Sequence, residues 1–193
     1  MIDRHLDTPI GKAGKIRTYS GLLVDPFQLS PDDIQIEDIA HSLSQLCRFT
    51  GHTRRFYSVA EHCLLVESIL AEDSYSPKIR LGGLLHEGGE PYLGDMAGPT
   101  KRRLSMREYD YAEHRAAEVV MQKFVGDLTK MERALIKEAD IEAYHIERDA
   151  LMRPGPHEPY TLYSQQGLGC NSRDISFTKR AFLAKFLELN KLT

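Results

Sequence analysis

Residues 81–95 read Leu-Gly-Gly-Leu-Leu-His-Glu-Gly-Gly-Glu-Pro-Tyr-Leu-Gly-Asp, an apolar run that changes abruptly into a dense polar cluster. His86 and Glu87 are adjacent residues at the point where the apolar run ends and the polar cluster begins. Removing an imidazole and a carboxylate from water at the end of a buried helix costs free energy, and a divalent cation is a common compensator. Gly88 and Gly89 follow, and each glycine in a helix costs about 1 kcal/mol relative to alanine. The pair indicates that something approaches the backbone closely here.

The apolar run itself is predicted to be helical. Ser76 followed by Pro77 is typical of a helix start, with serine at the N-cap and proline in the first helical position. The spacing of leucines then predicts a helix that continues through His86 toward Glu90. Pro91 is expected to end or kink it.

A second helix is predicted upstream, where Ser58 and Glu61 form a capping box. In a capping box each of the two side chains satisfies an orphaned backbone donor of the first turn. An apolar run through Leu70 follows. His62 is therefore expected in the first turn of this helix.

The helix before it shows apolar residues at steps of three and four between Ile36 and Cys47, the stripe of an amphipathic helix. Arg48 and Phe49 are expected to close it.

Two more capping boxes predict two further helices, one at Ser105 with Glu108 and one at Thr129 with Glu132. A terminal helix is expected within 172–193, where phenylalanines and leucines recur at helical spacing.

The segments between these helices lack sustained periodicity. Residues 1–33 are expected to form an irregular arm, with a short extended piece around Ile16 to Tyr19. Residues 154–171 are rich in Pro, Gly and Ser and predict a long loop. We therefore expect one all-α domain over 1–193, a helical bundle with an N-terminal arm.

Composition excludes several classes of function. The chain has 193 residues, 41% of them hydrophobic, which suits one core, and a formal net charge of −3. A protein that neutralises many phosphates along DNA or RNA would be strongly basic, so extended nucleic-acid binding is not expected. Three cysteines without metal-type spacing fit a reducing cytoplasm. No apolar run approaches the ~20 residues of a membrane span, so we expect a cytoplasmic protein without membrane contact.

Two more residues join His86 and Glu87 as candidate metal ligands. His62 lies among positions that look like core, and Asp140 lies in an apolar stripe that runs from Leu135 to Ile146. Each alone could be ordinary, a core or surface histidine and a solvated aspartate. Together, two histidines and two carboxylates suit a divalent metal such as Mn, Co, Zn, Fe or Mg.

These motifs resemble those of the HD-domain metal-dependent phosphohydrolases. The matching features are Phe-Tyr-Ser-Val-Ala-Glu-His at 56–62, the 84–95 stretch with Pro99 and Lys101 behind it, and Ala139-Asp140. The likeness is closest to the bacterial and phage branch that contains 5'-deoxynucleotidases and phage deoxyadenosine-triphosphate triphosphohydrolases. It implies an all-α HD-domain bundle, hydrolysis of a small-molecule nucleotide, and assembly as a homo-oligomer.

The resemblance also implies roles for individual residues. The metal ligands would be His62, His86, Glu87 and Asp140. Glu90 and Asp95 would be the acids that handle the attacking water and the leaving group. Arg48 and Phe49 would lie against the nucleotide, and Lys101 would hold phosphate. Arg54 and Arg55 are close enough in sequence to His62 to line the entrance of the same site. Position 87 departs from the family, which has aspartate where this chain has Glu87.

Two alternatives remain open at this point. A nucleotide-binding or regulatory protein could keep the site and lack turnover because of Glu87. A helical protein with no ligand would give the same periodicity. No glycine-rich loop with Lys-Ser or Lys-Thr is present, which argues against a P-loop NTPase.

Overall fold

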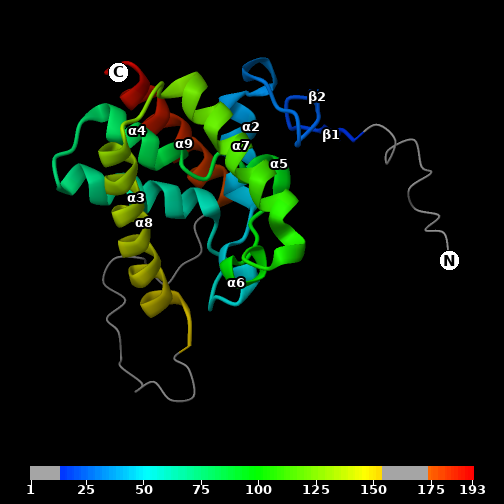
Figure 1. Ribbon diagram of the computed structural model, residues 1–193. Coiled ribbons are helices and arrows are strands. Elements are labelled where there is room, and N and C mark those ends of the chain that lie inside the picture. The colour runs from blue at the N-terminus through cyan, green and yellow to red at the C-terminus, as the bar shows by residue number, and fades with distance from the viewer. Residues whose placement is uncertain (1–13, 154–173) are drawn as a thin grey trace.

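The computed structural model describes residues 14–153 and 174–193, and the expected loop at 154–171 and the first part of the arm lie outside these ranges. The described chain is all-α apart from one small hairpin (Figure 1). Its helices are α2 (Ile36–Gln45), α3 (Val59–Glu72), α4 (Pro77–Leu85), α5 (Glu90–Leu93), α6 (Gly98–Lys101), α7 (Arg107–Phe124), α8 (Lys130–Leu151) and α9 (Ile175–Asn190). Short 3₁₀ turns cover Pro31–Asp33, Arg48–Gly51 and Leu104–Met106.

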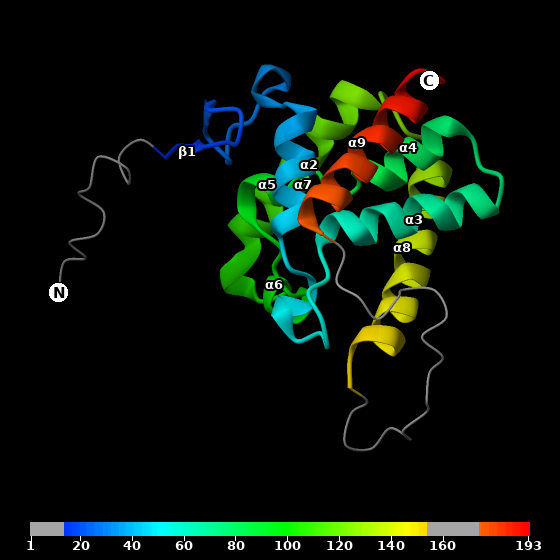
Figure 2. The ribbon, with the colours of Figure 1, turned by 180° about the vertical axis from the view of Figure 1, so that it is seen from behind.

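The described part of the arm is more ordered than its sequence suggests. Strands β1 (Ile16–Arg17) and β2 (Leu23–Val24) pair antiparallel, with Ile16 opposite Val24. The turn between them is tied to α2, because the Ser20 backbone N–H and hydroxyl both donate to the Asp38 carboxylate. The hairpin therefore has a fixed place beside α2 (Figures 1 and 2).

Helices α3, α4 and α8 form the part of the fold that carries the site. α4 packs against both α3 and α8, and the long α8 crosses α3 steeply (Figure 2). α9 covers the other side of α4 and reaches α2. At Gly83 an added Cβ would collide with the side chain of Leu70 on α3. Glycine at this position therefore allows α4 to approach α3 closely.

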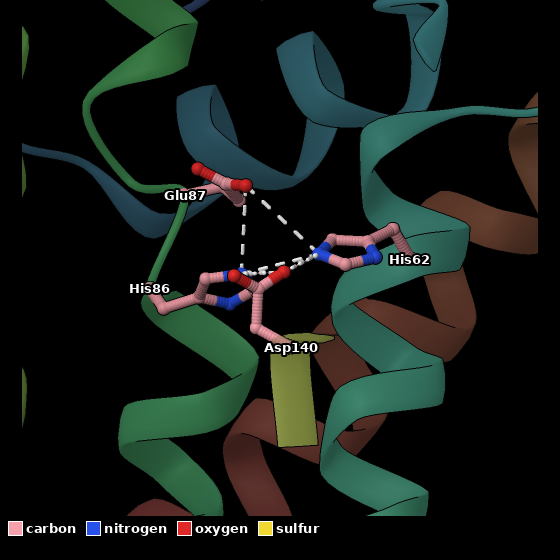
Figure 3. Close-up of side chains that lie close together, drawn as sticks. All are labelled: His62, His86, Glu87 and Asp140. Carbon is pink, nitrogen blue, oxygen red and sulfur yellow. Dashed lines mark hydrogen bonds and ion pairs between the residues drawn. The ribbon is translucent and has the colours of Figure 1, made fainter. Parts of the chain in front are cut away.

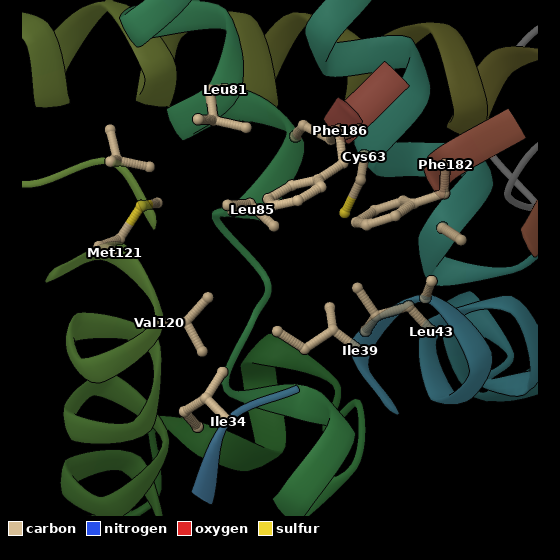
Figure 4. Close-up of a cluster of buried hydrophobic side chains, with 14 of the residues drawn as sticks. Ile34, Ile39, Leu43, Cys63, Leu81, Leu85, Val120, Met121, Phe182 and Phe186 are labelled. Atoms are coloured by element: carbon tan, nitrogen blue, oxygen red, sulfur yellow. The ribbon is translucent and has the colours of Figure 1, made fainter. Parts of the chain in front are cut away.

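The main core lies where α2, α3, α4, α7 and α9 meet (Figure 4). The large side chains that are fully buried in it include Ile34, Ile39, Leu43, Leu85 and Phe182. A smaller cluster, which includes Val66, Leu70 and Ala143, joins α3 and α4 to α8. Across the described ranges, none of the helices has both the length and the apolar character of a membrane span.

Local signals predicted three helix starts correctly. Ser58 and Glu61 form the expected capping box at α3, and Thr129 and Glu132 form the one at α8. Ser76 also caps α4 by accepting from a backbone N–H of the first turn.

The capping box expected at Ser105 and Glu108 is wrong. Ser105 lies inside the 3₁₀ turn Leu104–Met106, and Met106 occupies the N-cap position of α7 without a side-chain hydrogen bond. The helix exists, but the preceding turn removes the serine from the position where its oxygen could cap.

Two predicted helix ends also differ. α2 ends at Gln45, because Cys47 pairs with Ser58 in an antiparallel bridge, and Arg48 and Phe49 begin a separate 3₁₀ turn. α4 stops at Leu85, one residue before the His-Glu pair, and four turn residues connect it to α5. Pro91 is the second residue of α5 and does not end α4; a proline is tolerated in the first turn of a helix, where its missing N–H needs no partner within the helix.

Candidate metal centre

Four side chains from three parts of the chain converge on one point (Figure 3). His62 comes from the first turn of α3, His86 and Glu87 from the turn after α4, and Asp140 from the middle of α8. One ligand atom from each lies within 4.8 Å of the others.

The shortest distances join the two imidazoles and the aspartate. His62 Nε2 lies 3.1 Å from His86 Nε2 and 3.2 Å from Asp140 Oδ1. Glu87 Oε1 is 3.5 Å from His86 Nε2 and 3.9 Å from His62 Nε2. Ligands bound at about 2.0–2.2 Å to one ion lie about 3–4 Å from one another. The spacing therefore suits a shared ion.

The hydrogen bonds of the outer ring nitrogens decide which atoms face the centre. His62 Nδ1 lies 2.7 Å from Glu147 Oε1, and His86 Nδ1 lies 2.7 Å from the carbonyl oxygen of Gly83. Both partners are acceptors, so each Nδ1 carries the hydrogen and each neutral ring presents the lone pair of Nε2. Two lone pairs 3.1 Å apart repel unless a proton or a metal ion lies between them. The residues present therefore fit a metal ion.

The charges of the cluster point the same way. Burial disfavours ionisation of Asp140 and Glu87, but hydrogen bonds and charge from the two histidines hold the pKa of both carboxyls well below the usual range. A proton competes with a metal ion for Nε2 of His86: burial would lower the pKa of this ring, yet the Glu87 and Asp140 carboxylates raise it well above its ordinary value. The cluster thus holds two ionised carboxylates and attracts positive charge.

Sequence reasoning missed Glu147, which is fully buried under His62. Besides His62, its carboxylate accepts hydrogen bonds from Arg48 Nε and from the hydroxyl of Tyr57, each at 3.1 Å. Hydrogen-bonded carboxylates of this kind orient a metal-bound histidine. The sequence did offer a signal for Glu147, because it lies one helical turn after Ala143 and so on the same face of the helix. The apolar stripe predicted from the sequence ends at Ile146 instead, which is 38% exposed, so this part of the prediction is wrong.

A cavity of about 490 Å³ opens beside the four ligands. The ligands Glu87 and Asp140 reach its wall. Every residue to which the resemblance gave a substrate or catalytic role also lines it, namely Arg48, Phe49, Glu90, Asp95 and Lys101. The fold thus brings these positions to one place.

One wall of this cavity is aromatic. The ring of Phe49 stacks near that of Tyr144 from α8, with centroids 5.9 Å apart and planes inclined by 28°. Phe49 and Thr50 have φ of 54° and 52°, in the left-handed region that non-glycine residues seldom adopt. This conformation costs free energy and sets Phe49 at the cavity, beside Arg48. Tyr144 was not among the predicted site residues.

Glu87 also belongs to a second group, which consists of acids only. Glu90 and Glu113 each offer a carboxylate oxygen that lies within 4.8 Å of those of Glu87 and of one another. Burial, together with the neighbouring carboxylates, raises the pKa of Glu90 well above its ordinary value. Burial also raises the pKa of Asp95. Lys101 Nζ donates to Glu113 Oε1, which ties the predicted phosphate-binding lysine to α7.

Two expectations near the site are corrected. Arg54 donates to the carbonyl of Met152, and Arg55 bonds with Glu61, so neither is part of the cavity wall. Gly89 lies against α7, where an added Cβ would be 2.5 Å from the carbonyl oxygen of Glu113. The close approach that the glycine pair indicated is therefore that of a helix.

Comparison with known proteins gives two relatives. No protein-family model matches the chain. It is 34% identical over 133 residues to YfdR of Escherichia coli K12, covering 69% of this chain and 70% of YfdR. It is 36% identical over 181 residues to a protein of Rhodobacter capsulatus, covering 88% of this chain and 92% of that protein. Both relatives are named as uncharacterized proteins. The chain belongs to the same family as YfdR and this Rhodobacter protein.

Proposed function

We propose that this protein is a metal-dependent phosphohydrolase that acts on nucleotides, with deoxynucleotides as the favoured substrates. The observation that carries the proposal is the shared cavity: a cluster of four candidate metal ligands adjoins cationic, aromatic and acidic side chains. Each of the three kinds of group answers one requirement of phosphate-ester hydrolysis.

The metal would be held by His62 and His86 through Nε2 and by Glu87 and Asp140 through carboxylate oxygens. A mixed set of two imidazoles and two carboxylates suits Mn, Co, Fe or Zn and, less well, Mg. When bound, such an ion neutralises charge on phosphoryl oxygens and makes nearby water more acidic.

Arg48 and Lys101 would bind the phosphate. The Arg48 guanidinium is held by Glu147 through Nε at 3.1 Å, and its NH1 lies 3.6 Å from Glu87 Oε1, so it is oriented at the edge of the ligand cluster. A planar guanidinium presents paired donors that match phosphate oxygens. Lys101, at the end of α6, lines the same cavity and adds a point charge.

Glu90 and Asp95 would handle the two protons. Glu90 is next to Glu87 and is 3% exposed, and in our proposal it takes a proton from the water whose oxygen attacks phosphorus. Asp95, on the loop after α5, gives a proton to the oxygen that leaves as the phosphorus–oxygen bond breaks. The products are the phosphate and the alcohol or shorter phosphate of the leaving group.

The aromatic wall would receive the base. Phe49 and Tyr144 offer apolar ring faces beside Arg48, and bases stack on such faces. The preference for deoxyribose rests on the family resemblance of the motifs alone.

The test is a screen of all deoxy- and ribonucleoside mono- and triphosphates with Mn, Co, Mg, Zn and Fe ions. Phosphate, pyrophosphate and triphosphate are read separately, with His86→Ala as the negative control. We expect multiple turnovers with at least one deoxynucleotide. A metal-loaded native protein that releases no product from any of these nucleotides contradicts the proposal.

A further inference from the structure

Three carboxylates meet beside the metal ligands. Glu87 comes from the turn after α4, Glu90 is the first residue of α5, and Glu113 lies on α7. One oxygen from each lies within 4.8 Å of the other two. Glu87 belongs both to this group and to the group with the two histidines.

Two of these carboxylates are buried and incompletely paired. Glu90 is 3% exposed and Glu113 is 7% exposed. Within residues 14–153 and 174–193, no hydrogen-bond donor reaches Glu90 Oε2 or Glu113 Oε2, and both atoms are shielded from solvent. A buried acceptor without a partner is costly, and three acids in contact add repulsion.

The cations nearby leave these two oxygens unsatisfied. Lys101 Nζ donates to Oε1 of Glu113, and Arg48 NH1 lies 3.6 Å from Oε1 of Glu87. The free oxygens of Glu90 and Glu113 therefore lack a compensating positive charge.

We infer that Glu87, Glu90 and Glu113 bind a second divalent cation, next to the one held by the histidines. An all-oxygen donor set prefers hard ions such as Mg²⁺ or Mn²⁺, whereas the set with two imidazoles prefers a borderline ion. The two sites differ in chemistry and share Glu87. The proposed function requires only the histidine site, so this inference goes beyond it.

The position of the three carboxylates suggests what a second ion would do. Glu87 and Glu90 line the 490 Å³ cavity, and Glu87 and Glu113 line another of about 460 Å³ toward α7. Lys101 borders both. A cation between them adds positive charge on the α7 side of a phosphate bound at Lys101.

The test counts ions rather than turnover. The full chain is stripped with a chelator and titrated with Mn²⁺, and bound metal per chain is read by elemental analysis and electron paramagnetic resonance. We expect two ions per native chain, with the spectrum of a spin-coupled pair. Glu113→Gln should bind one uncoupled ion. The matched control Glu108→Gln, an exposed position on the same helix, should bind two.

One ion per native chain overturns the inference, and so do two ions in Glu113→Gln. If Glu113→Gln fails to fold by circular dichroism, Lys101→Met decides, since it removes the positive charge that competes for Glu113. We then expect the dissociation constant of the more weakly bound Mn²⁺ ion to fall about tenfold. An unchanged dissociation constant overturns the inference. A native chain with two ions and no hydrolysis contradicts only the proposed function.

Discussion

Glu147 accepts a hydrogen bond from His62 Nδ1 at 2.7 Å, although the two residues lie 85 positions apart in the chain. The same carboxylate also accepts from Arg48, which lines the cavity, and from Tyr57 in the core. One buried acid therefore orients a metal ligand and a proposed phosphate-binding residue together. This connection joins α8 to α3 and to the turn before it.

Glu147→Gln should weaken metal binding by about 10- to 100-fold, because a neutral amide oxygen is a weaker acceptor for His62 Nδ1 than the carboxylate and makes the ring less basic. The dissociation constant is measured by competition with a metallochromic chelator. The control is Glu142→Gln, an exposed position on the same helix, which should bind as the native chain does. Equal affinities in the two variants would show that Glu147 has no role in orienting His62.

His86→Ala and Asp140→Ala should each abolish stoichiometric metal and all turnover, because each removes one of the four converging ligands. Bound metal is measured by elemental analysis after gel filtration. Asp149→Ala, a half-buried position near the end of α8 that pairs with its neighbour Arg148, serves as the control. Either site variant with native metal content and near-native rates would make the ligand assignment wrong.

Glu90→Gln should keep the ion at the histidine site and keep nucleotide binding, while turnover falls by about 10²-fold or more. The amide preserves size but cannot accept the proton of the attacking water. Single-turnover rates and nucleotide affinity are compared with those of the native chain. An unchanged rate constant would remove Glu90 from the proposed mechanism.

Glu87→Asp tests whether the native residue supports or disables chemistry. We expect an active native enzyme in which the shorter aspartate lowers the rate or changes the preferred metal, because Glu87 reaches both histidines and Arg48. Rates with Mn, Co, Mg, Zn and Fe are compared for the two proteins. A native chain that binds nucleotide without hydrolysis, together with an active Glu87→Asp, would favour the binding-protein alternative.

Gly89→Ala should lower the free energy of unfolding by about 1–3 kcal/mol, because its Cβ would strike the Glu113 carbonyl and α7 must move away. The matched control is Gly98→Ala, whose Cβ meets only the flexible end of the Arg102 side chain. Urea denaturation measures both. Equal stabilities would show that α7 does not depend on a glycine at position 89.

Some features of this protein were determined locally by the sequence. The capping boxes at Ser58 and Thr129 start helices where they were expected, because a cap involves residues three positions apart. The metal ligands could be proposed from residue type, since a histidine or carboxylate at an apolar helix position requires compensation.

Other features were decided only by tertiary contacts. α2 ended early because Cys47 pairs with Ser58 in an antiparallel bridge. Glu147 reads as one more acid on a helix until α8 crosses α3 and brings it under His62. Gly89 is explained by α7, which packs on it from further along the chain. Each depends on which surfaces meet, and the spacing of residues within one helix carries no information about the surface of another.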